Sequence, residues 1–168
     1  MKGRALPWLI ALAVLGLDQL TKMAVMRCLP PGGWLPVFPG FTITHVHNRG
    51  IAFSLFADGG PVTRILLQAA ITVAVGIIAW VVYRHGGRGT LAGVALGLIL
   101  GGAAGNLVDR FLHGWVVDFL RLWVRAGGRI WTWPDFNVAD SAITVGAVLL
   151  VLAEFRRPGE TDHAPDPD

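Results

Sequence analysis

The sequence predicts a mainly α-helical membrane protein with four transmembrane helices. Its composition is far from that of a soluble domain, with 54% apolar residues, 15% charged residues and a mean hydropathy of +0.58. Crossing a hydrocarbon core of about 30 Å takes roughly 20 mainly apolar residues. Four runs are long enough, at 6–26, 62–83, 90–108 and 138–155, the last only just.

These runs leave little chain for a second domain, so we expect residues 1–157 to form a single integral membrane domain. The basic start and the triplet at 11–13 resemble a signal peptide with its cleavage site. The apolar run continues through that triplet to Leu17, which favours a retained helix over a removed leader. Residues 158–168 are acidic, contain proline and lack apolar periodicity, which predicts a disordered cytoplasmic tail.

The third run carries a regular pattern of small residues. Glycine recurs there at every fourth position, as Gly93, Gly97, Gly101 and Gly105. Small residues at this spacing let a neighbouring helix approach closely, so the pattern predicts a tight helix bundle.

The distribution of basic residues predicts the orientation. Basic residues near helix ends on short loops tend to stay in the cytoplasm. Their number does not separate the two sides, but their density does. On one side they crowd into short flanks, including Arg84 and Arg88 around the connection RHGGRG, whereas on the other they are spread through 27–61 and 109–137. We therefore expect both termini in the cytoplasm and the two longer segments outside.

Both longer segments look structured. The stretch FTITHVH, at 41–47, alternates threonine with other side chains and follows two prolines, which predicts a short strand. Residues 111–133 include four tryptophans, at 115, 123, 131 and 133. Tryptophan favours the membrane interface, so we expect this segment to lie along the outer surface.

Polar residues gather near one end of the runs, although an ionisable residue at the centre of a membrane helix costs roughly 2.5–3.5 kcal/mol on insertion scales. The set comprises Asp18 and Lys22 in the first run, Asn106, Asp109 and Arg110 at the end of the third, Asp118 in the segment that follows, and Asn137 and Asp140 at the start of the fourth.

Several of these residues have a structural explanation. Asp18 and Lys22 have the i, i+4 spacing of a helical ion pair, with the acid first. The polar residues at 106, 109 and 110 are placed to bind backbone groups where the third helix stops. Asn137 is predicted to cap the fourth helix, with Asp140 at its third position.

Asp118 and Asp140 are harder to explain in this way. The positive end of a helix dipole stabilises a carboxylate such as Asp140 by typically about 0.3–1 kcal/mol. This is too little to explain an aspartate so near the hydrocarbon. Two carboxylates in a poorly hydrated site share one proton, so that one acts as base while the other acts as acid. This is the chemistry of an aspartic peptidase.

Other chemistries fit less well. Neither Ser54 nor Ser141 lies in a glycine-flanked nucleophile turn. His45 and His47 would share one face of a strand, but no HExxH motif or cysteine cluster accompanies them, so we expect no metal and no cofactor. The basic residues are scattered despite a pI near 9.8, which argues against nucleic-acid binding.

Two alternatives come from other functional classes. Membrane-embedded aspartate and lysine also serve as ion pathways, so a small ion or proton transporter is one alternative. A transporter would distribute polar groups across the full thickness, whereas the inner halves of the last three runs are almost purely apolar. A purely structural subunit is the other alternative, and it would not require both Asp118 and Asp140 to be acidic.

The chain resembles the lipoprotein signal peptidases, the bacterial signal peptidase II family, nearly from end to end. The resemblance rests on four ordered motifs, which are DQLTK at 18–22, NRGIAFS at 48–54, GGAAGNLVDRF with HGWVVDF at 101–119, and FNVADSAI at 136–143. Four motifs in this order on a four-helix profile are highly specific.

The resemblance implies an intramembrane aspartic endopeptidase that cuts prolipoproteins just before a diacylglyceryl-modified cysteine. By motif, Asp118 and Asp140 match the catalytic pair. The residues that match positions supporting the site or the substrate are Asn48, Gly50, Asn106, Asp109, Arg110, Asn137, Asp18 and Lys22.

The resemblance also implies a small extracytoplasmic β-sheet and an interfacial helix, which fit 27–61. It places the protein in the bacterial inner membrane, with both termini cytoplasmic and the active site toward the outer surface. We expect a monomer that contacts membrane lipid. The connection at 121–135, with three arginines, is longer than the family pattern.

Overall fold

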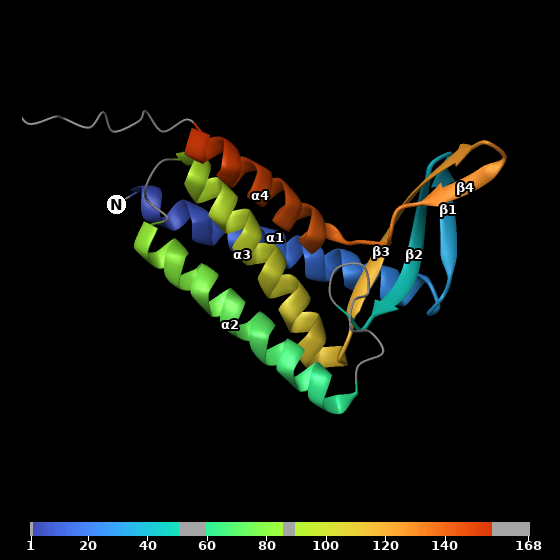
Figure 1. Cartoon of the computed structure of the whole chain (residues 1–168), viewed down its shortest axis with the longest axis horizontal. Coiled ribbons are helices and arrows are strands. Elements are labelled where there is room, and N and C mark those ends of the chain that lie inside the picture. The colour runs from blue at the N-terminus through green and yellow to red at the C-terminus, as the bar shows by residue number, and fades with distance from the viewer. Residues whose placement is uncertain (1, 51–59, 86–89, 156–168) are drawn as a thin grey trace, which may run out of the picture.

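The computed structural model describes residues 2–50, 60–85 and 90–155. Four helices and four strands make up this part of the chain (Figure 1). The helices are α1 (Lys2–Cys28), α2 (Pro61–His85), α3 (Thr90–His113) and α4 (Val138–Phe155), and the strands are β1 (Trp34–Phe38), β2 (Phe41–Asn48), β3 (Val116–Ala126) and β4 (Arg129–Thr132).

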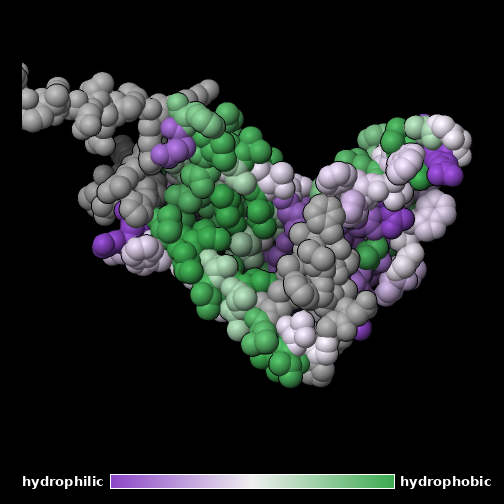
Figure 2. All heavy atoms as spheres, viewed as in Figure 1, coloured by the Kyte–Doolittle hydropathy of each residue, from purple (hydrophilic) through white to green (hydrophobic). Residues whose placement is uncertain are grey.

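The helices form a bundle in which α3 is central and packs against α1, α2 and α4. The start of α1 and the end of α4 lie at one end of this bundle, and the sheet extends from the opposite end (Figure 1). Figure 2 shows hydrophobic residues over the helical part and hydrophilic residues in the notch between helices and sheet. The polar residues therefore concentrate where the bundle meets the sheet.

Three helices, α1, α3 and α4, are long and apolar enough to cross a membrane. In α2 the apolar stretch among the described residues is shorter, at Gln68–Arg84, although the helix itself has 25 residues. At about 1.5 Å per residue such a helix is about 37 Å long, enough for the hydrocarbon core. The predicted runs all correspond to helices. The third is longer than predicted, because α3 continues through Asp109 and Arg110 to His113.

The glycines of α3 allow the helix contacts that the sequence predicted. A Cβ atom on Gly97 would lie 2.6 Å from the carbonyl oxygen of Pro7, and one on Gly101 would lie 2.6 Å from that of Ala11. Both contacts are with the backbone of α1, which cannot move aside as a flexible side chain can. Gly146 of α4 is similarly close to the backbone of α3. Glycine therefore sets the distance between α1 and α3.

The sheet is antiparallel, with the strand order β1-β2-β3-β4. The predicted strand at 41–47 is confirmed as β2. The sequence did not predict that part of the tryptophan-rich segment forms β3 and β4. Gly127 and Gly128 make the two-residue turn between them with φ angles of 58° and 72°, and two positive φ values match the right-handed twist of a hairpin.

The interfacial helix expected within 27–61 does not occur in residues 29–50, where the chain forms β1, β2 and turns. The part of that prediction at 51–59 lies outside the described residues, as does the predicted tail at 158–168.

Candidate active site

Asp118 lies in the buried first half of β3. Gly114, with a φ of 80°, ends α3 and turns the chain into this strand. The Asp118 side chain is buried and accepts two hydrogen bonds: Asn48 Nδ2 on the neighbouring strand β2 donates to Oδ2 at 3.0 Å, and Asn137 Nδ2 donates to Oδ1 at 2.7 Å. Both oxygens of this carboxyl group are thus held by amides.

Asp140 lies in the first turn of α4, where the predicted cap is confirmed. Its backbone N–H donates to Asn137 Oδ1 at 2.9 Å, and its Oδ2 accepts from the N–H of Asn137 at 3.2 Å. This reciprocal pair is the capping-box arrangement, with aspartate in place of the usual glutamate or glutamine. The cap fixes the Asp140 side chain against the helix start.

Asn137 and Asn106 join the two aspartates. The side-chain amide of Asn137 donates through its nitrogen to the carboxyl group of Asp118 and accepts through its oxygen from the backbone N–H of Asp140. Asn106, from α3, donates from Nδ2 to Asp140 Oδ1 at 2.7 Å. Elements that are far apart in the sequence therefore place two carboxyl groups on one hydrogen-bonded network.

The pKa of Asp118 is raised to about 7. Burial is the main cause, because it disfavours the charged carboxylate, and the nearby negative charge of Asp140 adds to the effect. The hydrogen bonds from Asn48 and Asn137 act in the opposite direction. Near neutral pH the Asp118 carboxyl group can therefore hold a proton.

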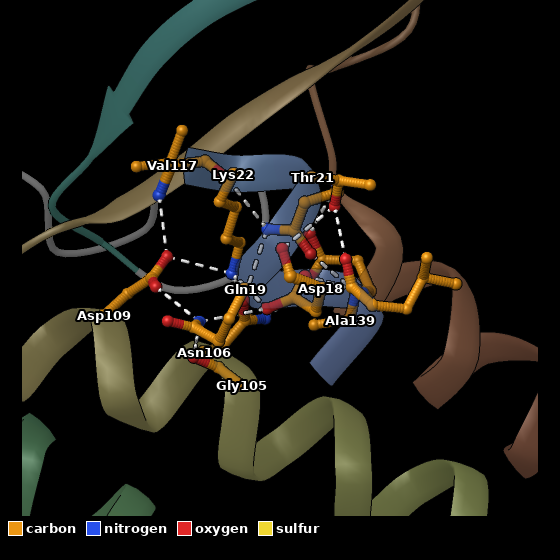
Figure 3. A network of polar contacts seen from close by, with 12 residues as sticks. Asp18, Gln19, Thr21, Lys22, Gly105, Asn106, Asp109, Val117 and Ala139 are labelled. Carbon is orange, nitrogen blue, oxygen red and sulfur yellow. Dashed lines mark hydrogen bonds and ion pairs between the residues drawn. The ribbon is translucent and has the colours of Figure 1, made fainter. Parts of the chain in front are cut away.

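A buried ionic cluster forms around Lys22, between α1 and α3 (Figure 3). The Nζ atom of Lys22 lies 2.8 Å from Asp18 Oδ2 and 2.9 Å from Asp109 Oδ2, so the predicted ion pair with Asp18 is confirmed. Lys22 Nζ also donates to Asn106 Oδ1 at 2.9 Å. The cluster is thus connected directly to the amide that binds Asp140.

Arg110 reaches the site from the last turns of α3. Its Nη2 donates to the carbonyl oxygen of Gly50 at 2.8 Å, and the N–H of Gly50 donates to Asn48 Oδ1 at 2.9 Å. Gly50 therefore takes part through its backbone, and it links Arg110 to the amide that binds Asp118.

Comparison with known proteins identifies the family. Residues 10–156 match the family model described as signal peptidase (SPase) II. The chain belongs to the signal peptidase II family. The lipoprotein signal peptidase of Paraburkholderia phytofirmans is 48% identical over 156 residues, covering 92% of this chain and 88% of the relative. That of Burkholderia mallei is 46% identical, covering 92% and 91%.

The fold is also that of a solved membrane enzyme. A bacterial membrane enzyme determined by the in meso method at 1.9 Å resolution superposes with a TM-score of 0.74 at 28% identity, covering 90% of this chain and 94% of that one. A second such structure, at 2.3 Å resolution, gives a TM-score of 0.73 at 28% identity, covering 96% and 94%. This signal peptidase II family member is a membrane protease, and the transporter alternative finds no support.

All ten site residues predicted from the sequence of this signal peptidase meet in one region. The sequence interpretation missed Gln19, whose Nε2 donates to Asp109 Oδ1 at 2.8 Å and to the carbonyl oxygen of Gly105 at 3.2 Å. Gln19 is part of the motif DQLTK, so its position beside Asp18 was the available signal.

Asp135 is oriented away from the pair, although it lies only five positions before Asp140. Arg121 binds both of its oxygens, with Nε at 2.7 Å and Nη2 at 2.6 Å, and Thr44 donates to Oδ2 at 3.2 Å. In the signal peptidase, Asp135 therefore connects the sheet to the start of α4.

His45 and His47 contact each other in the signal peptidase. Their Nε2 atoms are 3.1 Å apart, and His45 Nδ1 lies 2.8 Å from the carbonyl oxygen of Leu29. Within the described ranges, no group of three or more His, Cys, Asp or Glu residues is placed to hold a metal ion. The absence of a metal requirement stays a prediction.

Proposed function

We propose that this protein removes the signal peptide from prolipoproteins by hydrolysis just before a diacylglyceryl-modified cysteine, with Asp118 and Asp140 as the catalytic pair. One observation carries this proposal. Asn137 holds both carboxyl groups, because its side-chain amide donates to Asp118 Oδ1 and its backbone N–H donates to Asp140 Oδ2, and burial raises the pKa of Asp118 to about 7.

The two aspartates have different roles in this mechanism. Asp140, at the positive end of α4 and bound by Asn106, acts as the carboxylate base and takes a proton from the attacking water. The resulting hydroxide adds to the scissile carbonyl carbon. Asp118, with its raised pKa, supplies a proton as the peptide C–N bond breaks, so that the leaving amine departs neutral. No metal or cofactor is required.

The position of the pair suits a substrate that is anchored in lipid. The start of β3 carries Asp118 and the start of α4 carries Asp140, and both starts lie where the helix bundle meets the sheet, at the end opposite the start of α1 (Figure 1). With both termini cytoplasmic, as the basic flanks indicate, this end faces the extracytoplasmic surface of the inner membrane. Water can enter from outside while the acyl chains stay in the bilayer. The network is complete within one chain, which supports a monomer.

Substitution of each aspartate tests the assignment. Asp118→Asn and Asp140→Asn should each reduce kcat by at least roughly 1,000-fold, because asparagine keeps size and polarity but cannot accept or release the proton. The double variant should be hardly slower than either single variant, since the two groups act as a unit. Cleavage of a purified lipidated prolipoprotein measures both effects.

Asp135→Asn is the matched control, because Asp135 binds Arg121 and Thr44 rather than the pair. It should keep near-normal activity. Near-normal cleavage by either Asp118→Asn or Asp140→Asn, or an equally inactive Asp135→Asn, would contradict the assignment.

Cleavage should also depend on the diacylglyceryl group. Burial of acyl chains contributes about 0.8 kcal/mol for each CH₂ group, so much of the binding energy of a lipid-facing site comes from the lipid. Unmodified precursor should therefore be cut far more slowly than its lipidated form at equal concentration. Equal turnover of the two would overturn the proposed substrate.

A further inference from the structure

Lys22 lies at the centre of the buried cluster (Figure 3), and its polar partners are Asp18, Asp109 and Asn106 rather than either aspartate of the pair. Only 1% of its side chain is exposed. An ammonium group has three donors and no acceptor. The three partners of Lys22, which are Asp18, Asp109 and Asn106, match these donors in number and all present oxygen.

The two carboxylates that bind Lys22 also bind the backbone beside the catalytic pair. Asp109 Oδ2 accepts from the N–H of Val117 at 3.1 Å, and Val117 directly precedes Asp118. Asp18 Oδ1 accepts from the N–H of Ala139 at 2.9 Å, and Ala139 directly precedes Asp140. Lys22 therefore bridges two carboxylates, and each of them binds the backbone N–H group of the residue that precedes a catalytic aspartate.

The third contact of Lys22, at 2.9 Å, sets the orientation of Asn106 together with a longer hydrogen bond from Asn137 Nδ2 to the same oxygen, at 3.2 Å. Because an ammonium group can only donate, Asn106 must present its Oδ1 to Lys22. Its Nδ2 then faces Asp140 and donates at 2.7 Å. The reversed amide would bring N–H groups against the ammonium group and an oxygen against the carboxylate. Lys22 thereby ensures that Asp140 Oδ1 receives a hydrogen-bond donor.

We propose that Lys22 is a positioning residue that assigns the base role to Asp140 by orienting Asn106, and that sets the separation of the two aspartates through Asp18 and Asp109. This role rests on the proposed function, because it presupposes that the aspartates are the catalytic pair. The charged groups that act on the pair are Lys22 from α1, which acts on Asp118, and Arg110 from α3, which acts on both aspartates; Asp109 acts on Lys22 and Arg110.

Removal of the lysine charge tests this role. Lys22→Met alone leaves two buried carboxylates without their cation, so the protein can fail to fold. Lys22→Met combined with Asp109→Asn keeps the net charge of the cluster, and the new asparagine can still accept from Val117. This double variant should bind lipidated substrate with an unchanged KM while kcat falls about 100-fold, as expected for a misplaced catalytic group.

The pH profile separates positioning from general support of the fold. Without an oriented Asn106 amide, the Asp140 carboxyl group loses a hydrogen bond of the kind that stabilises a carboxylate. The decline of kcat on the acidic side of its pH profile, which we call the acid limb, should then move to higher pH. Asn106→Leu should cause the same shift while leaving Lys22 with both carboxylates. When Asn106→Leu is added to the double variant, kcat should fall hardly further than in the slower of the two parent variants, since both changes remove the same hydrogen bond from Asn106 to Asp140. Asp109→Asn alone should keep its acid limb.

Met23→Ala controls for effects on α1, because Met23 is exposed on the bundle surface. The positioning role would be overturned if Asn106→Leu, correctly inserted in the membrane, or the charge-matched double variant kept the wild-type acid limb. Additive decreases in kcat when the two are combined would overturn it as well. Activity in Asp118→Asn or Asp140→Asn would instead overturn the proposed function. Inactive aspartate variants together with wild-type behaviour of the Lys22 and Asn106 variants would reject the positioning role alone.

Discussion

The carboxyl group of Asp118 is both ionisable and buried, so the proton that it holds affects the stability of the protein as well as its activity. In the folded protein its pKa is raised to about 7, from an ordinary value of 3.8. Between these two values the folded state holds a proton that the unfolded state has released. The free energy of unfolding must therefore fall as pH rises through this window, by about 1.4 kcal/mol per pH unit at most.

Asp118→Asn should accordingly abolish cleavage but increase stability above pH 7. Asparagine carries no charge, so the variant avoids the cost of burying a carboxylate there, and its single amide oxygen can still accept from either Asn48 or Asn137. Thermal unfolding in detergent at pH 5 and pH 8 measures the effect, and the gain over wild type should be larger at pH 8. A variant less stable than wild type at pH 8 would contradict the proposed cost of the charge.

The same carboxyl group should limit wild-type activity at high pH. An acid that must hold a proton is lost as pH rises through its pKa, so kcat should decline above about pH 7. A kcat profile of purified enzyme on lipidated substrate measures this limb. A kcat that stays constant from pH 6 to pH 9 would argue against Asp118 as the acid.

At the scale of elements, the α1–α3 contact depends on backbone approaching backbone. Gly101 faces Ala11 so closely that a single methyl group would lie 2.6 Å from a carbonyl oxygen and 2.8 Å from Val14 Cβ. The same helices carry Lys22 and Asn106 toward the ends that adjoin the sheet. The distance between the helices therefore also determines whether Lys22 reaches Asn106.

Gly101→Ala should destabilise the protein by roughly 1–3 kcal/mol, as overpacking in a well-packed contact does. This sign is opposite to the usual effect, because alanine is favoured over glycine in helices by about 1 kcal/mol. Gly76→Ala on α2 is the matched control, since a Cβ there meets no atom within 4 Å. Thermal unfolding in detergent compares the two. Equal stability would show that α1 and α3 are further apart than described.

At the scale of the whole molecule, the sheet and the polar residues lie at one end of an apolar bundle. The face of β3 that carries Asp118 continues outward through Leu122 and Val124, because alternate residues of a strand share a face. Both are exposed, as is Trp131, which pairs with Val124 across the hairpin. This exposed apolar surface supports a location of the sheet at the membrane surface.

The chain's single cysteine allows a direct test of orientation. Cys28 is exposed at the end of α1 that adjoins the sheet, so a membrane-impermeant maleimide should label it in intact spheroplasts. The control is Cys28→Ser combined with Tyr83→Cys. Tyr83 is exposed near the opposite end of the bundle, so its replacement should react only after permeabilisation. The reverse labelling pattern would place the active site on the cytoplasmic side.

The sequence by itself determined the features that depend on residues close to one another in the chain. The four apolar runs, the ion pair between Asp18 and Lys22, and the cap of α4 by Asn137 all follow from spacing within one element. The motifs also brought together the residues of the site. Helical periodicity and capping are local, so a linear pattern is enough to predict them.

Only the tertiary structure decided how these residues contact one another. The hydrogen bond between Asn48 and Asp118 joins positions 70 residues apart, and that from Ala139 to Asp18 joins positions 121 apart. The strands at 116–126 and 129–132 also went unpredicted, because apolar, arginine and tryptophan residues there lack clean alternation. Contacts at such separations depend on how helices and sheet pack, and the glycine-controlled distance between α1 and α3 determines which oxygens Lys22 can reach.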